Sequence, residues 1–66
     1  MNLNKLKGKV AEQGKNQKEL MDTLGLKYVA INKKFNGKTK FTTEEISKIK
    51  DVLSLTNDEV VEIFLS

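Results

Sequence analysis

Sixty-six residues with 38% hydrophobic content allow one domain with one small core, and the absence of cysteine and histidine excludes disulfide bonds, thiolate or imidazole metal sites, and catalysis by either residue. The net charge of +3 is unevenly distributed: residues 1–40 carry ten lysines against three acidic residues, a net charge of +7, whereas residues 41–66 carry two lysines against six acidic residues, a net charge of −4. This division predicts one face that meets a polyanion; the alternative is a charged surface that serves only solubility.

Apolar residues at helical spacing predict the first two helices. The first helix ends near Gly14, and its apolar positions are Leu3, Leu6 and Val10. The second begins after Asn16, a favourable N-cap residue, with Glu19 three positions later. Its apolar stripe consists of Leu20, Met21 and Leu24. Gly25 then supplies a residue that can adopt a positive φ where this helix ends.

A third helix is expected from about Tyr28 to Phe35, with Ile31 and Phe35 on one face, and residues 36–38 (NGK) end it. Lys27 occupies its cap position, although Ser, Thr, Asp or Asn is preferred there and the helix dipole disfavours a cation. Further lysines follow at Lys33, Lys34, Lys38 and Lys40. We interpret Lys27 as a cation placed for a nearby phosphate or guanine; the alternative is a solvated surface residue.

Capping boxes predict the starts of the last two helices. In each box, a threonine and a glutamate three residues later exchange hydrogen bonds with the backbone; the pairs are Thr42–Glu45 and Thr56–Glu59. Apolar residues flank both boxes at the hydrophobic-staple positions, Phe41 with Ile46 and Leu55 with Val60. The buried stripes are expected to be Ile46, Ile49 and Leu53, then Val60, Ile63 and Phe64. The pattern predicts a compact all-α domain of five helices.

Residues 16–35 thus form a predicted unit of helix, glycine turn and helix, with apolar residues spaced as in two crossing helices: Leu20, Leu24, Leu26 and Ile31. Here the chain resembles the phage Cro/repressor group of the XRE-type helix-turn-helix family. The matching motifs are N-Q-K-E-L at 16–20, L-G-L at 24–26, N-G-K-T-K at 36–40, F-T-x-x-E-I-x-x-I from Phe41, and E-I-F-L near the C-terminus. The resemblance covers residues 3–65. It implies a single lambda-repressor-like domain over residues 1–66, with a helix-turn-helix at about 16–36.

Two residues depart from the family pattern. Met21 stands where Ala or Gly is usual because the two helices approach closely, and the larger side chain can widen their crossing. Lys34 stands where an apolar residue is common. We expect Phe35 to take over that core position.

The resemblance implies a sequence-specific regulator of transcription, of phage or prophage Cro type, that occupies an operator in double-stranded DNA. Its third helix would enter the major groove. The base-contact candidates are Lys27, Tyr28, Val29, Asn32 and Lys33. Lys can donate to guanine, Asn can pair with adenine, and Val can touch a thymine methyl group. The phosphate-contact candidates are Asn16, Gln17, Asn36, Lys38 and Lys40. The chain has no arginine, so the commonest bidentate contact with guanine is missing.

The apolar residues near the C-terminus predict a second contact. They cover more of the last helix than one core needs, and the candidates for a homodimer contact, at least on DNA, are Val61, Phe64 and Leu65. The alternative is a helix packed wholly within one domain. Tyr28, Asn32 and Lys33 likewise have an alternative as ordinary surface residues.

We expect no enzymatic activity, cofactor, metal or small-molecule substrate, because the chain contains no nucleophile–base pair and no phosphate-binding loop. No apolar run approaches the roughly 18 residues of a membrane span and no signal peptide is visible, so a cytoplasmic, nucleoid-associated protein without membrane contact is expected. The alternative function is a protein-binding modulator or antirepressor that engages another repressor through the same scaffold.

Overall fold

The helices begin and end close to the residues that the sequence marks as caps. The computed structural model describes residues 1–65, and over this range the chain forms five helices and no strand: α1 (Leu3–Glu12), α2 (Gln17–Leu24), α3 (Tyr28–Phe35), α4 (Thr43–Leu53) and α5 (Asn57–Phe64). The predicted all-α fold of five helices is confirmed. Within residues 1–65, no helix combines the length and the apolar character required to cross a bilayer.

Side chains cap four of these helices. The N-cap residues whose side-chain oxygen accepts a first-turn amide hydrogen are Asn2, Asn16, Thr42 and Thr56. Both predicted capping boxes are present: the Thr42 hydroxyl accepts from the Glu45 amide at 3.1 Å while the Glu45 carboxylate accepts from the Thr42 amide at 2.8 Å. Thr56 and Glu59 repeat this exchange at 3.1 and 2.9 Å. Each such cap contributes about 1 kcal/mol. The N-cap of α3, Lys27, makes no side-chain cap hydrogen bond.

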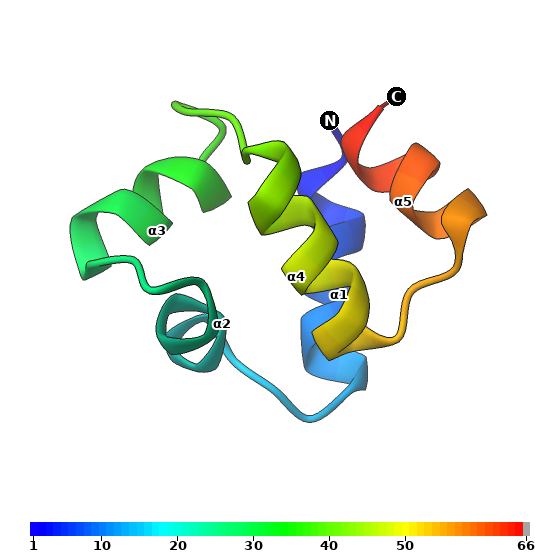
Figure 1. Cartoon of the computed structure of the whole chain (residues 1–66), viewed down its shortest axis with the longest axis horizontal. Helices are drawn as coiled ribbons and strands as arrows, with labels where there is room; N and C mark the ends of the chain where they lie inside the picture. Colours follow the sequence, from blue (N-terminus) through cyan, green and yellow to red (C-terminus); the bar gives the residue numbers. More distant parts are fainter. Residues whose placement is uncertain (66) are drawn as a thin grey trace.

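The core lies where the five helices meet. Figure 1 shows α4 crossing the middle of the molecule, with α2 and α3 on one side and α5 on the other. The buried apolar residues are Leu6, Val10, Leu20, Leu24, Ile31, Phe35, Phe41, Ile49, Leu53, Leu55, Ile63 and Phe64. The Phe41 ring packs edge-on against Phe35 and Phe64, with ring centroids 5.7 Å apart in both pairs. Each helix therefore buries most of the apolar stripe that its spacing predicts, while four stripe residues are only partly buried: Leu3, Met21, Ile46 and Val60.

The two ends of the chain are joined at what we term the α1–α5 flank, the surface shared by α1 and α5. The amide of Asn2 donates to the carbonyl of Ile63 at 2.6 Å, and Figure 1 shows the termini next to each other. Lysines of α1 form ion pairs with carboxylates of α5, Lys5 with Glu62 and Lys9 with Glu59. Charge on this flank is therefore largely neutralised within the domain.

Candidate nucleic-acid interface

A turn of three residues joins α2 to α3 and sets the direction in which α3 leaves the core. Gly25 adopts φ 67° and ψ 29°, the left-handed conformation expected of a glycine at the end of α2. The amide of Leu26 donates back to the carbonyl of Met21 at 3.0 Å, and the Leu26 side chain is half-buried against the core. Lys27 returns to extended backbone, with φ −85° and ψ 163°. This path places Ile31, which is fully buried, on the side of α3 that faces the core.

The helix α3 has one buried side and one exposed side. Ile31 is 0% exposed and Phe35 is 3% exposed, so Phe35 takes the core position expected of it beside Lys34. On the exposed side, 67% of Tyr28 and 64% of Val29 are accessible. The other predicted base-contact residues are the exposed Lys27 and Lys33 and the half-buried Asn32. The fold thus brings all five candidates to the start and the outward side of one short helix.

A hydrogen bond links the two helices beside this exposed side. The side-chain amide of Gln17, in the first turn of α2, donates from Nε2 to Oδ1 of Asn32 on α3 at 2.7 Å, and both side chains are half-buried. Asn16 precedes Gln17, and its Oδ1 accepts from the Glu19 amide at 2.9 Å. The oxygen of Asn16 is therefore engaged as a cap, so its predicted phosphate contact would have to be made by its NH₂ group.

Lys34 turns away from the exposed side and joins α3 to α4. Its ammonium donates to Oε1 of Glu45 at 2.8 Å and to the carbonyl of Lys40 at 2.9 Å, and it lies 5.7 Å from the centre of the Phe41 ring. The Lys34 and Glu45 side chains are only 11% and 13% exposed. Burial alone raises the pKa of Glu45, but hydrogen bonds from Lys34 and the Thr42 amide outweigh it, so this pKa is lowered. Lys34 is therefore a structural lysine.

The loop after α3 is held by its own backbone. Gly37 has φ 77°, and the predicted end of the helix at Asn36 and Gly37 is confirmed. The amides of Lys38 and Thr39 both donate to the carbonyl of Lys33, at 2.9 and 3.4 Å. The predicted phosphate-contact residues of this loop are all exposed: Asn36, Lys38 and Lys40. Their side chains thus extend from a fixed backbone.

The lysines of residues 1–65 fall into two groups. In one group, carboxylates neutralise Lys5, Lys9 and Lys34. In the other, which we term the unpaired lysines, no carboxylate lies within 4.0 Å in the described chain; those beside α3 are Lys27, Lys33, Lys38 and Lys40. Positive charge is therefore left uncompensated at α3 and the loop that follows it.

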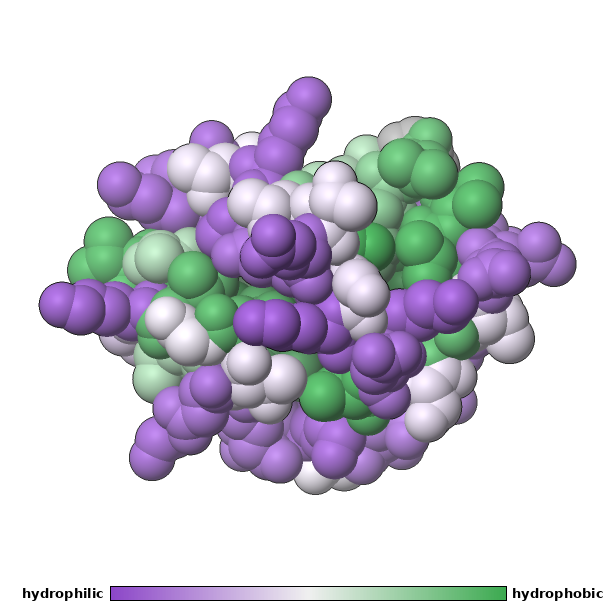
Figure 2. Space-filling view, viewed as in Figure 1, coloured by the Kyte–Doolittle hydropathy of each residue, from purple (hydrophilic) through white to green (hydrophobic). Residues whose placement is uncertain are grey.

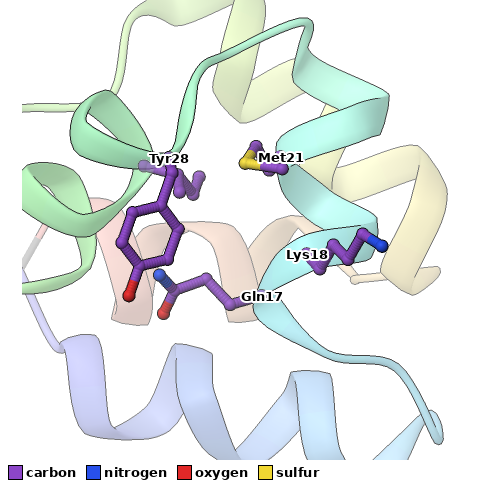
Figure 3. Close-up of a pocket in the computed structure, with 5 residues that line it drawn as sticks. Gln17, Lys18, Met21 and Tyr28 are labelled. Atoms are coloured by element: carbon purple, nitrogen blue, oxygen red, sulfur yellow. The ribbon is translucent and has the colours of Figure 1, made fainter.

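Two hollows lie beside the predicted base-contact residues of α3. One, of about 280 Å³, is almost wholly apolar and is lined by Gln17, Lys18, Met21, Tyr28 and Ile31. Figure 3 shows the Tyr28 ring and the Gln17 side chain next to each other at this hollow, with Met21 and Lys18 on the α2 side. Met21, the larger residue at the helix crossing, therefore forms part of a surface hollow. A second, wider hollow of about 460 Å³ is lined by Lys27, Val29, Ala30, Lys33, Lys34 and Thr39.

The predicted dimer-contact residues divide between surface and core. Val61 and Leu65 are 51% and 72% exposed. Met1, which precedes the Asn2 that bonds to Ile63, is 42% exposed. Phe64 is instead 7% exposed and packs edge-on against Phe41, so its ring is committed to the core. Figure 2 shows apolar surface gathered over the α5 end of the molecule, near the termini. Of the three candidates, only Val61 and Leu65 have side chains free to touch a partner.

Two contacts near this face are absent from the sequence-based prediction. The first is the bond between Gln17 and Asn32, which were assigned separately to phosphate and base contact. The second is the ion pair of Lys34 with Glu45, whose carboxylate was predicted to act only as the acceptor of the capping box. The only sequence signal for the second is the replacement of an apolar residue by Lys34, which implies a buried cation that needs a partner.

A comparison with known families gives a match that covers the whole chain. The family model described as "Protein of unknown function (DUF739)" matches residues 1–66. The chain therefore belongs to the DUF739 family. No curated protein and no solved structure matches it.

Proposed function

We propose that this DUF739 protein binds double-stranded DNA in a sequence-specific manner and regulates transcription by occupying an operator, as phage and prophage regulators of the Cro type do. In this proposal α2, the turn at Gly25 and α3 act as a helix-turn-helix, within a lambda-repressor-like arrangement of the five helices. The protein would act in the cytoplasm on the bacterial nucleoid or on phage DNA. No chemical step is needed, because occupancy of the operator excludes or redirects polymerase.

The observation that carries the proposal is the composition of the exposed side of α3. Its inward residues, Ile31 and Phe35, are buried, so the helix cannot rotate without opening the core. Its outward side presents Tyr28 and Val29, and the unpaired lysines surround it. A rigid, exposed helix in a field of uncompensated positive charge is suited to the major groove of a duplex, which admits one α-helix.

The roles follow from the placement of each group. Lys27, Tyr28, Val29, Asn32 and Lys33 are assigned to base edges. Phosphates are assigned to the first turn of α2 and the loop after α3, that is, to Asn16, Gln17, Asn36, Lys38 and Lys40. The lysines in this set carry no carboxylate partner among residues 1–65, so binding a phosphate requires no ion pair to be broken.

Selection from a pool of random duplexes, followed by sequencing, tests the proposal directly. We expect enrichment of a defined site, and a binding constant that falls steeply with salt because several phosphates are neutralised. In a titration with the selected duplex at low ionic strength, the backbone amide signals of residues 27–40 should shift. A pool that stays random after repeated selection, together with unmoved amide signals, contradicts the proposal.

The apolar hollow beside Tyr28 favours a second candidate function, that of a protein-binding modulator that engages another repressor. Its apolar lining of Met21, Tyr28 and Ile31 has the character of a pocket for a partner side chain. Salt dependence separates the two functions. A contact centred on this hollow should keep its affinity as salt rises, whereas DNA binding should lose it.

We further propose that two copies of the chain pair through the exposed apolar residues Val61 and Leu65, at least on DNA. A two-fold dimer would place the two α3 helices roughly 34 Å apart, one turn of DNA. Sedimentation of the protein, free and with the selected duplex, is the measurement. Val61→Lys should abolish a dimer, whereas Lys48→Ala, an exposed change on α4, should not; a wild-type protein that is monomeric in both conditions removes the dimer from the proposal.

A further inference from the structure

We infer that Lys34 is a positioning residue for DNA binding: its ammonium fixes the backbone at Lys40, which directs the Lys40 side chain toward a phosphate, while Lys34 itself touches no DNA. The inference rests on the proposed DNA-binding function and adds to it a residue on the inward side of α3. It gives the partly buried ion pair of Lys34 and Glu45 a role beyond stability.

The Lys34 ammonium makes two hydrogen bonds, which we term the Lys34 bridge. It donates to the carbonyl of Lys40 at 2.9 Å and to Oε1 of Glu45 at 2.8 Å. Only 11% of the Lys34 side chain is exposed, so water competes weakly with these charge-assisted bonds. Because a lysine carries three N–H donors, it can serve both oxygens at once.

The Lys34 bridge joins three parts of the chain. Lys34 lies in the last turn of α3, and Lys40 lies in the loop that follows. Glu45 lies in the first turn of α4. The carboxylate oxygen that accepts from Lys34 also accepts from the amide of Thr42 at 2.8 Å. The position of the loop is therefore set from both helices.

The loop carries predicted phosphate contacts on a backbone that is held in two stages. At its start, the amides of Lys38 and Thr39 donate to the carbonyl of Lys33. Further on, the Lys34 bridge holds the carbonyl of Lys40, and burial of Phe41 holds the next residue. The Lys40 side chain itself is exposed. A charged group on a fixed backbone loses less conformational freedom when it binds, so the bridge strengthens the contact of Lys40 with a phosphate.

Stability alone does not account for the Lys34 bridge. Replacing both partners of an ion pair with well-packed apolar residues is often neutral for stability. Apolar side chains in place of Lys34 and Glu45, however, would leave the Lys40 carbonyl without this donor and the loop without its link to α4. What the ion pair adds is the placement of the loop.

The first test removes the ion pair at constant net charge. In Lys34→Met with Glu45→Gln, one positive and one negative charge disappear, and the Gln oxygen can still accept from the Thr42 amide. We expect affinity for a selected duplex to fall by about three- to tenfold, because the loop must then be ordered on binding. Base preferences should stay the same, since the base-contact candidates are unchanged. Fluorescence anisotropy measures the affinity, and selection from random duplexes measures the preferences.

A double-mutant cycle with Lys40 shows whether the Lys34 bridge acts through that residue. In the wild type, Lys40→Ala should lower affinity about fivefold and reduce the salt slope by about 1, as the loss of one phosphate contact does. In the Lys34 and Glu45 variant, the same change should cost less than about twofold. The matched control, Lys9→Met with Glu59→Gln, removes an ion pair of the α1–α5 flank at constant net charge. In that background Lys40→Ala should cost as much as in the wild type.

A measurement on the wild-type protein avoids any folding defect of a variant. In the free protein, the hydrogens of the Lys34 ammonium should exchange with water more slowly than those of the exposed Lys48. The selected duplex should shift the ammonium signal of Lys40 and leave that of Lys34 in place. Equal exchange rates for Lys34 and Lys48, or an equal cost of Lys40→Ala with and without the bridge, overturns the inference while DNA binding stands. A wild-type pool that remains random removes both.

Discussion

Lysines on the α1–α5 flank and lysines on the outward side of α3 differ in whether a carboxylate neutralises them. On the flank, Lys5 and Lys9 form ion pairs with carboxylates of α5. Beside α3, Lys33 and Lys38 have no carboxylate within ion-pair distance in the described chain. Two acidic residues of the second half, Glu59 and Glu62, thus pair with lysines of α1. Glu45 pairs with the inward Lys34, and no acidic residue among residues 1–65 pairs with the lysines on the outward side of α3.

This difference changes the meaning of the charge division in the sequence. A basic first half and an acidic second half do not become a basic half and an acidic half of the molecule, because α1 is basic and lies against the acidic α5. What remains uncompensated is a smaller set around α3 and its following loop. A lysine count therefore overstates the surface available to a polyanion, and the pairing of each lysine decides its role.

The largest expected effect is the loss of DNA affinity when two unpaired lysines are removed. Lys33→Ala with Lys38→Ala should weaken binding to a selected duplex by on the order of 10- to 100-fold at low salt, and should reduce the salt slope by about 2. Stability should change by less than about 0.5 kcal/mol, because both side chains are exposed and neither forms an ion pair within residues 1–65. Fluorescence anisotropy across a salt series measures both quantities.

The matched control removes the same charge elsewhere. Lys48→Ala with Lys50→Ala takes two lysines from α4, where the Lys50 ammonium donates to the Asn57 side chain at an exposed site. Affinity should fall far less than in the α3 double variant. Equal losses for the two double variants would mean that net charge, and not the placement of the unpaired lysines, drives binding.

The next effect concerns the structural lysine that follows Lys33. Lys34→Met leaves the half-buried carboxylate of Glu45 without its cation, and should lower the free energy of unfolding by about 2 kcal/mol, less than a fully buried pair because both side chains keep some solvent contact. Urea denaturation provides the measurement. The double variant Lys34→Met with Glu45→Gln should recover part of this loss, because no charge is then left unpaired and Gln preserves the capping box. A single variant as stable as wild type contradicts the structural role.

Lys27→Ser should separate stability from binding at one position. Serine can accept a hydrogen bond from the first-turn amides of α3, which Lys27 does not, and the repulsion between a cation and the helix N-terminus disappears. We expect a gain of about 1 kcal/mol in stability by urea denaturation, together with weaker operator binding. Unchanged binding would assign Lys27 to the solvated surface.

The fold was predictable because its determinants are local. Thr42 with Glu45 mark the start of α4 within four residues, and Gly25 marks the end of α2 by its own backbone conformation. Helical spacing correctly placed Phe64 in the buried stripe of α5, but the apolar run Val61, Phe64 and Leu65 also made it a dimer-contact candidate, which its burial does not support. That burial depends on the Phe41 ring, which the chain brings in from the start of α4.

The candidate site was predictable in its residues but not in its contacts. The exposed side of α3 follows from the burial of Ile31 and Phe35, which the spacing indicated. The bonds from Gln17 to Asn32 and from Lys34 to Glu45 join residues 15 and 11 positions apart, and depend on how α2, α3 and α4 pack. Lys34 at a usually apolar position indicates that it needs a partner, but no local signal identifies Glu45 as that partner or pairs Gln17 with Asn32. Whether the site binds DNA stays a prediction.

The smallest expected effect concerns pH and tests the ion pair between Lys9 and Glu59 on the α1–α5 flank. The hydrogen bond from Lys9, together with the Thr56 amide, lowers the pKa of Glu59 to about 2, from 4.5. A carboxyl whose pKa is lower in the folded chain than in the unfolded one adds stability that is complete above the unfolded value and disappears as pH falls through the folded value. The contribution of Glu59 should therefore be lost between about pH 4.5 and pH 2.

Glu59→Gln isolates that contribution, because the amide oxygen of Gln preserves the capping box with Thr56 while the ion pair with Lys9 is removed. Urea denaturation at a series of pH values should show a shallower loss of stability over this acid range than in the wild type. Glu44→Gln, which removes an exposed carboxylate outside any ion pair among residues 1–65, should follow the wild-type slope. Because Glu59 lies on the flank and away from α3, its replacement should leave DNA affinity at neutral pH unchanged. A loss of affinity equal to that of the Lys33 and Lys38 variant would erase the distinction between the two regions.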